Sequence, residues 1–193
     1  MSTMFLSASV PIPGRGRFFE TADPFLIQLA VRQLVLSTIR DWRIVWGGHP
    51  AITPMMWNVC QDIGVSYTER VTLYQSDFFK SEFPEENRQF ENVVVVKGVP
   101  GEREASLDAL RRAMLSRPDL RAAVFVGGME GVIQEFELFR GYHPGAPVLP
   151  VTASGGAARD LAVLLNMPDV ERPTVDFARL FEEWFPTQSD VNP

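Results

Sequence analysis

Short, continuous apolar runs alternate along the chain with longer segments whose apolar residues recur at helical spacing. A bounded apolar run predicts a buried β-strand, and apolar residues at positions i, i+4 and i+7 predict one face of an α-helix. The predicted strands cover residues 4–10, 43–46, 71–74, 93–96, 122–126 and 148–151. The predicted helices cover residues 24–40, 55–63, 102–116, 131–139, 157–165 and 177–185. This alternation is typical of a mainly parallel sheet with helices on both faces, so the pattern predicts an α/β, Rossmann-like, doubly wound fold.

Chain length and composition favour a single globular domain. The 193 residues can bury a sizeable core, and 46% hydrophobic with 22% charged residues is ordinary for a globular protein. We therefore expect one domain over residues 1–193, in which residues 171–193 form a C-terminal tail with a short helix. The charged segment 80–92 contains a proline and is expected to form a surface loop or a short helix.

Charge and hydropathy argue against several kinds of partner. The net charge is −6 and no basic stripe could neutralise phosphates, so we expect no nucleic-acid partner. No apolar run approaches the roughly 20 residues that span a bilayer, and the N-terminus lacks a signal-peptide pattern. We therefore expect a cytoplasmic protein that does not bind membranes. The single cysteine, Cys60, excludes an internal disulfide and lies in an apolar helical pattern, which favours a core position. No motif indicates a metal ion or a cofactor.

A glycine turn joins the predicted strand 122–126 to the next predicted helix. Gly127, Gly128 and Gly131 surround Met129 and Glu130 there. The first amides of a helix have no intrahelical acceptor and lie at its positive end, and glycine lets an anion approach the backbone closely. The turn therefore predicts a phosphate site, although a tight turn between strand and helix remains the alternative.

Glu135 follows this turn at helical spacing. It lies four residues after Gly131 and seven after Gly128, so it shares their helix face. A carboxylate just below an anion site can act in catalysis, or it can accept backbone N–H bonds and make the turn rigid. Both roles for Glu135 stay open.

Small and polar residues follow other predicted strands, and parallel strands end at the same edge of a sheet. The candidate ligand-binding residues outside the main turn are Ser7, Ala8, Ser9, Gly47, Gly48, His49, Gln75, Ser76, Thr152 and Ser154. Ligands of doubly wound folds lie over this edge. His49 could act as an acid or base, or it could be a loop histidine bonded to backbone. We expect these residues to line one site for a phosphorylated small molecule.

Two of the glycine turns resemble those of a known family. Residues 127–135 (GGMEGVIQE) are similar to the P-G-G-x-G-T-x-x-E signature of the LOG-type, lysine-decarboxylase-like phosphoribohydrolases, and Trp46-Gly47-Gly48 looks like their earlier glycine-rich turn. The wider pattern is closer to the SLOG superfamily, whose members associated with TIR and Sir2 domains bind ADP-ribose-like signals in prokaryotic immunity. The chain departs from the signature at Val126, which replaces proline, at Val132, which replaces threonine, and by one extra residue, Glu130.

This resemblance implies two functions of different classes. The first is binding or sensing of a nucleotide-derived molecule, such as an ADP-ribose-like or cyclic nucleotide signal, passed on to a separate effector protein. The second is hydrolysis of the N-glycosidic bond of a nucleoside 5′-monophosphate, with Glu135 or Glu130 as the catalytic carboxylate. The chain lacks the arginine–lysine pair that LOG-type hydrolases carry on an earlier helix; Arg103 or Arg111 could substitute. A structural protein whose turns bind nothing is a third alternative.

The resemblance also implies a homo-oligomer, most simply a dimer. Exposed aromatic side chains would favour it. The aromatic residues expected to be exposed are Trp57, Phe78, Phe79, Trp184 and Phe185.

Overall fold

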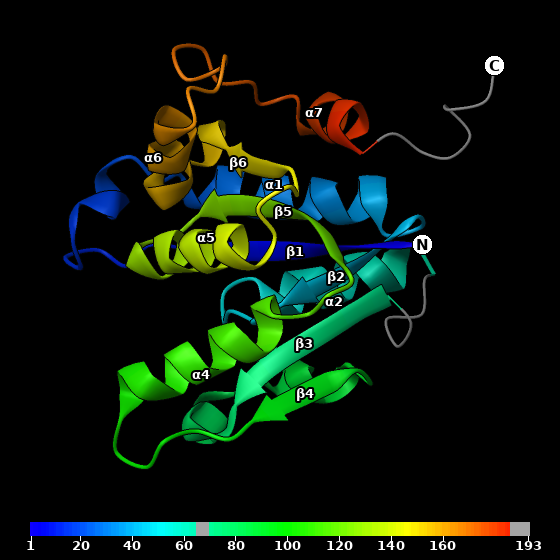
Figure 1. The fold of residues 1–193 in the computed structure, drawn as a ribbon. Helices are drawn as coiled ribbons and strands as arrows, with labels where there is room; N and C mark the ends of the chain where they lie inside the picture. The colour runs from blue at the N-terminus through cyan, green and yellow to red at the C-terminus, as the bar shows by residue number, and fades with distance from the viewer. Residues whose placement is uncertain (65–69, 186–193) are drawn as a thin grey trace.

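The strands of the protein form one parallel sheet (Figure 1). The computed structural model describes residues 1–64 and 70–185. The strands are β1 (Ser2–Ser9), β2 (Trp42–Trp46), β3 (Val71–Ser76), β4 (Val93–Val96), β5 (Leu120–Gly127) and β6 (Val148–Val151). Their order across the sheet is β4-β3-β2-β1-β5-β6. The predicted α/β, doubly wound fold is confirmed, and β4 and β6 have the predicted bounds.

Helices cover both faces of this sheet. The α-helices are α1 (Pro24–Thr38), α2 (Thr53–Asp62), α4 (Arg103–Leu115), α5 (Glu130–Tyr142), α6 (Gly156–Leu164) and α7 (Phe177–Trp184). Short 3-10 turns are η1 (Arg17–Glu20), η2 (Asp77–Glu82), η3 (Glu85–Gln89) and η4 (Thr152–Ser154). One apolar core joins the sheet to α1, α2 and α7, and a second joins its other face to α4, α5 and α6.

The residues of β1 show how the pleat separates the two cores. Met4 and Leu6 belong to the core under α1, whereas Phe5 between them belongs to the other core. Successive side chains of a strand point to opposite faces, so one apolar run serves both layers. The Phe5 ring packs against Phe125 and Phe139, with centroids 6.1 and 6.3 Å away. A continuous apolar run is therefore the pattern of a strand that is covered on both faces.

The strand order reverses between β1 and β5. The chain proceeds from β1 through β2 and β3 to one edge, and β5 then returns to the other side of β1. Ser7 pairs with Phe125 and Ser9 pairs with Gly127 at the carboxyl ends of these strands. In open α/β sheets ligands bind outside the carboxyl ends of the strands at such a reversal. The topology thus places the ends of β1 and β5 at the centre of a candidate site.

Two expectations about exposure are wrong. The β4 run was expected to be buried, but β4 forms the sheet edge, with Val94 38% and Val95 58% exposed. An edge strand has a neighbour on one side only, so its apolar composition does not ensure burial. None of the five aromatic residues proposed as exposed is so: Phe185 packs in the α1 core at 4% exposure, and the other four are half-buried.

The remaining expectations concern the charged segment 80–92, the single cysteine and membrane-spanning helices. The charged segment 80–92 forms parts of η2 and η3, as one of the two expectations allowed. Cys60 is fully buried in the α1 core, and burial raises the pKa of its thiol to about 12. In the described ranges 1–64 and 70–185, every helix is too short or too polar to cross a membrane.

Candidate functional site

The turns after β1, β5 and β6 are bonded to one another. The Gly127 amide donates to the Ser154 hydroxyl (2.8 Å), and that hydroxyl donates to the carbonyl of Val151. The Gly128 amide donates to the carbonyl of Ser9 (2.8 Å). These contacts hold three strand ends as one rigid edge. Because both glycine amides are used inside the protein, their contribution to a ligand site is the shape of the turn.

Glycine is required in this edge by both conformation and space. Gly128 has a φ of +83°, and a Cβ there would clash with Val132. Gly155 has a φ of +69°, and a Cβ there would collide with the carbonyl of Thr21. A side chain at either position would strain the backbone and displace a neighbouring segment.

The first turn of α5 supplies amides for an anion. Met129 is the N-cap residue, and the amides of Met129, Glu130 and Gly131 donate to no carbonyl among the described residues. Such amides at the positive end of a helix form an anion-binding arrangement. The phosphate site predicted over residues 127–131 therefore divides into two shaping glycines and three candidate donors. The Glu130 side chain itself is exposed, with its Oε1 near Gly16.

Glu135 lies half-buried beside a hydroxyl and a guanidinium, with 20% of its side chain exposed. The Ser7 hydroxyl donates to Oε2 of Glu135 (2.5 Å), joining β1 to α5. Arg111 Nε, from α4, lies 3.6 Å from Oε1 of Glu135, which is an ion pair but too long for a hydrogen bond. Burial raises the pKa of Glu135, while the bond from Ser7 and the charge of Arg111 act to lower it.

Arg111 also faces the first turn of α5. Its Nη2 would lie 2.9 Å from a Cβ built on Gly131. The Arg111 side chain is only 12% exposed, and its buried Nε has no hydrogen-bond acceptor in the described part of the chain. The positive charge of Arg111 thus lies beside Gly131, in the turn that carries the three free amides.

Arg111 was only one of two substitutes that the sequence offered for the missing arginine–lysine pair. Its helical spacing could have singled it out, because Arg111 lies four residues after Leu107 and three before Met114, on the apolar side of α4. An arginine on the apolar side of a helix needs an acidic or anionic partner.

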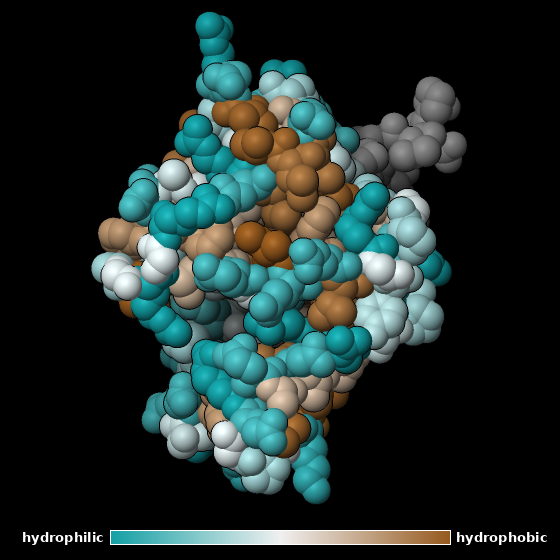
Figure 2. All heavy atoms as spheres, turned by 60° about the vertical axis from the view of Figure 1, so that its left-hand side comes forward, coloured by the Kyte–Doolittle hydropathy of each residue, from teal (hydrophilic) through white to brown (hydrophobic). Residues whose placement is uncertain are grey.

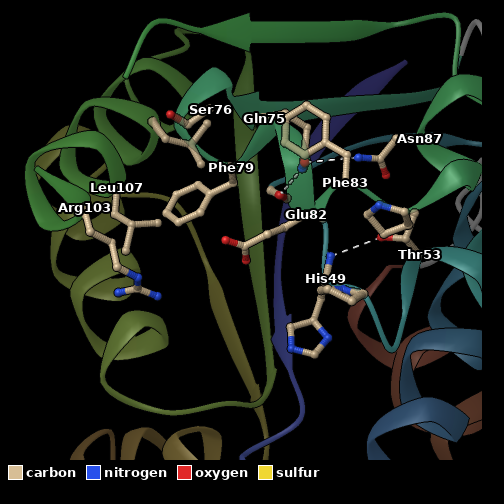
Figure 3. A pocket seen from close by; sticks show the side chains of 15 residues that line it. His49, Thr53, Gln75, Ser76, Phe79, Glu82, Phe83, Asn87, Arg103 and Leu107 are labelled. Atoms are coloured by element: carbon tan, nitrogen blue, oxygen red, sulfur yellow. Dashed lines mark hydrogen bonds between the residues drawn. The ribbon is translucent and has the colours of Figure 1, made fainter. Parts of the chain in front are cut away.

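A cavity of about 260 Å³ lies at the carboxyl ends of β2 and β3 (Figure 3). Its walls come from the Gly47–Pro50 turn, the end of β3, the η2–η3 segment and α4. The residues that line it are Gly47, Gly48, His49, Pro50, Thr53, Gln75, Ser76, Phe79, Glu82, Phe83, Pro84, Asn87, Arg103, Leu107 and Leu110. Five of them were predicted as ligand-binding residues, so the structure brings these five together in one cavity. Arg103 of α4 was named only as a possible substitute for the arginine–lysine pair, and the η2–η3 residues and the two leucines of α4 were not predicted, since only the fold brings them there.

Several of the predicted residues support this cavity through hydrogen bonds. Gln75 Nε2 donates to the carbonyl of Gly47 (2.6 Å), and Asn87 Nδ2 donates to Gln75 Oε1 (3.1 Å). The hydroxyl of Ser76 accepts from the amide of Phe78 (3.4 Å) and caps η2. Gln75 and Ser76 thus hold the cavity wall in place.

His49 is bonded to the loop backbone, as one of its two alternatives proposed. Its amide donates to the Thr53 hydroxyl (3.1 Å), and its ring Nδ1 accepts from the amide of Ala51 (3.2 Å). Burial lowers the pKa of His49, so the ring is neutral at physiological pH.

The cavity combines apolar walls with charged groups at its opening. Phe79, Leu107 and Leu110 supply apolar surface, and the Arg103 guanidinium lies 5.6 Å from the centroid of the Phe79 ring. Figure 3 shows the Glu82 carboxylate pointing into the space between Phe79 and His49. Such a cavity suits a flat, partly apolar group with polar edges.

The other predicted residues lie near the turns with different surroundings. Ser154 and Thr152 are buried, and the Thr152 hydroxyl donates to Oδ1 of Asp169 (3.0 Å). Ala8 and Ser9 are half-buried at the end of β1. Direct ligand contacts of these four residues stay predictions. Figure 2 brings this edge forward, with mostly hydrophilic side chains over its lower half and a hydrophobic band above.

In the described ranges, no three acidic, histidine or cysteine side chains come together in a geometry that could hold a metal ion.

Comparisons with known proteins identify a family. A family model described as the SLOG cluster3 family matches residues 17–185. Among solved structures, the X-ray structure of TM1055, a Northeast Structural Genomics Consortium target, aligns with a TM-score of 0.49 and 14% identity. The alignment covers 84% of this chain and 81% of that chain. No curated protein matches the sequence.

Proposed function

Since the chain belongs to the SLOG cluster3 family, we propose that it binds a phosphorylated nucleotide derivative at the carboxyl edge of its sheet. The resemblance of the glycine turns to those of ligand-sensing family members favours an ADP-ribose-like or cyclic nucleotide signal as the ligand class. In a sensor of this kind the bound state would be passed to a separate effector protein.

The position of Arg111 carries this proposal. Its guanidinium lies between Glu135 and the first turn of α5: Nε is 3.6 Å from the carboxylate, and Nη2 faces Gly131. A phosphate oxygen there would accept from Arg111 and from the amides of Glu130 and Gly131. Hydrogen bonds between a guanidinium and a phosphate are among the strong ones in proteins.

The ribose and the base of a nucleotide would also have suitable contacts at this site. The Glu135 carboxylate can accept a ribose hydroxyl, as acidic residues do in dinucleotide-binding folds. The cavity beside α4 has apolar walls at Phe79, Leu107 and Leu110 for the base. Arg111 and Leu110 are neighbours on α4, so one helix contributes to both parts.

A second candidate function is hydrolysis of the N-glycosidic bond of a nucleoside 5′-phosphate. The observation that favours it is the ion pair of Arg111 with Glu135, because a hydrolase needs a second positioned group beside its carboxylate. An ionised Glu135 would stabilise the oxocarbenium-like ribose of the transition state or activate water. Arg111 would hold the phosphate, and Ser7 would orient the carboxylate.

The test is a thermal-shift screen with AMP, NAD, ADP-ribose and cyclic ADP-ribose isomers, followed by product analysis of each mixture. A ligand at 100 times its Kd stabilises the folded state by about 2.7 kcal/mol. For a domain of this size we expect the Tm to rise by about 5–10 °C. A shift with intact ligand supports the sensor, and release of free base supports the hydrolase. If no compound gives either a thermal shift or turnover, both proposed functions are overturned.

Matched variants show whether the effect arises at this site. Arg111→Lys keeps the charge but loses the guanidinium fork, and we expect it to reduce the ligand-induced shift by more than half. Arg112→Lys is the control, because Arg112 is exposed and pairs with Asp108 on the same helix (2.7 Å). Equal effects of the two substitutions would contradict the role of Arg111. Glu135→Gln should preserve phosphate binding and abolish any release of base.

A further inference from the structure

The free edge of β4 is the most apolar strand surface that the described structure leaves uncovered. β4 consists of four valines and pairs with β3 alone. Val94 is 38% and Val95 58% exposed, and Glu91 and Lys97 on either side are exposed as well. An uncovered apolar edge strand is a template for pairing with another strand.

The hydrogen bonds of β3 fix which residues of this segment face outward. The Leu73 amide donates to the carbonyl of Asn92 (2.8 Å), so Asn92 directs its backbone groups toward β3. In an extended strand the backbone groups of successive residues point to opposite sides. Within β4 the free N–H and C=O groups at this edge therefore belong to Val93 and Val95, and continued pairing beyond the strand would bring in those of Glu91 and Lys97.

We propose that two copies of this chain associate through antiparallel pairing of β4 with β4, about a two-fold axis at Val94. A two-fold axis places the same patch of both copies in contact. In this register Val93 lies opposite the partner's Val95 and exchanges hydrogen bonds with it. Glu91 lies opposite the partner's Lys97, and Lys97 opposite the partner's Glu91.

The charges that flank β4 favour this strand register over the neighbouring registers. Outward-facing residues must pair with outward-facing residues, so the axis can lie at Val93, Val94 or Val95 but not between them. Only the axis at Val94 places both glutamates opposite both lysines. Opposite charges that face each other across strands stabilise a pair, and like charges destabilise it. Four identical valines would otherwise permit slippage between registers.

The surface fits a second copy of the chain better than an unrelated strand. It carries one acidic and one basic residue at equal distances from Val94, and the antiparallel two-fold exchanges these two positions. Pairing would also cover the exposed Val95 with the partner's Val93. The two sheets would become one continuous sheet, in which the carboxyl ends of the two copies' strands, and the candidate ligand sites beside them, point in opposite directions.

The experiment measures mass by sedimentation equilibrium on the full chain, with single and compensating charge variants. Wild type is expected to dimerise. Glu91→Lys and Lys97→Glu should each weaken the dimer about tenfold, because each creates two like-charge pairs per interface. The double variant Glu91→Lys with Lys97→Glu exchanges the charges and should restore the affinity to within about threefold of wild type.

Further variants separate this interface from other faces and from misfolding. Val95→Lys should yield a monomer whose circular dichroism and Tm remain those of a folded protein. Leu164→Lys on α6, at a side chain 65% exposed, should leave the dimer unchanged. A wild-type monomer at millimolar concentration would overturn the proposal. A dimer that resists Val95→Lys, or a double variant as weak as the single ones, would overturn it too.

Discussion

Glu135 illustrates how one residue combines a structural cost with a proposed functional role. Its side chain is half-buried, and desolvation raises the pKa of its carboxyl group above the ordinary value of 4.5 despite the neighbouring Ser7 and Arg111. The folded protein therefore retains a proton on Glu135 at pH values where the unfolded chain has released it. The contribution of Glu135 to stability is greatest below the ordinary pKa and falls as pH rises through the raised pKa.

The raised pKa of Glu135 predicts how the stability of the Glu135→Gln variant depends on pH. Glutamine keeps the shape and the acceptor for Ser7 but cannot ionise, so we expect the free energy of unfolding to depend less steeply on pH above about 4.5. At neutral pH the variant should be at least as stable as wild type. The measurement is urea unfolding from pH 4 to pH 8, with Glu137→Gln on the exposed side of α5 as the control. A variant less stable than wild type at pH 8 would contradict the prediction.

Substitution of a glycine in the main turn would test folding rather than ligand binding. Because a Cβ at Gly128 would clash with Val132 and strain a positive φ, its substitution should disturb folding before it affects binding. Substitutions at Arg111 are therefore the better probe of the ligand site.

At the scale of elements, helix starts follow local chemistry closely. The sequence Asp23-Pro24 predicts the beginning of a helix, and α1 begins at Pro24. Oδ1 of Asp23 accepts from the amides of Phe25 (2.9 Å) and Leu26 (3.1 Å). Both signals are local, since a cap satisfies amides two or three residues away and proline fits the first helical position.

Removal of this cap should destabilise the protein measurably. We expect Asp23→Ala to cost about 1 kcal/mol and to lower the Tm by about 2–4 °C. Asp62→Ala is the matched control, because Asp62 is exposed at the end of α2. Scanning calorimetry of both variants measures the difference, and equal Tm values would show that the cap contributes nothing.

Strand burial shows the limit of reasoning from single elements. The runs of β4 and β6 are equally short and both lie at sheet edges, yet all four residues of β6 are buried while the middle of β4 is exposed. Hydropathy identifies both strands. It does not say which edge neighbouring helices cover.

At the scale of the whole molecule, the candidate site is assembled from distant parts of the chain. Ser7 and Glu135 are separated by 128 positions, and Arg111 comes from a third element. Packing of α4 against α5 brings the guanidinium to the carboxylate, and pairing of β1 with β5 brings Ser7. A ligand at this site should therefore affect several separate segments at once.

Hydrogen exchange tests this assembly. With the compound that gives the largest thermal shift, we expect slower exchange in peptides that cover residues 7–10, 47–53 and 128–134. Peptides of α7 on the opposite face of the sheet should exchange at unchanged rates. Mass spectrometry of exchanged, digested protein measures this, and protection confined to one segment would contradict a site at the shared edge.

The sequence by itself determined the elements, their alternation and the sheet edge at which the candidate residues lie. These depend on periodicity, caps and glycine turns, which act over a few residues. Only the tertiary structure decided that Arg111 rather than Arg103 pairs with Glu135, that the amides of Gly127 and Gly128 are already bonded, and that η2 and η3 close the cavity. Such contacts depend on how helices pack on a sheet, and no local pattern specifies that packing.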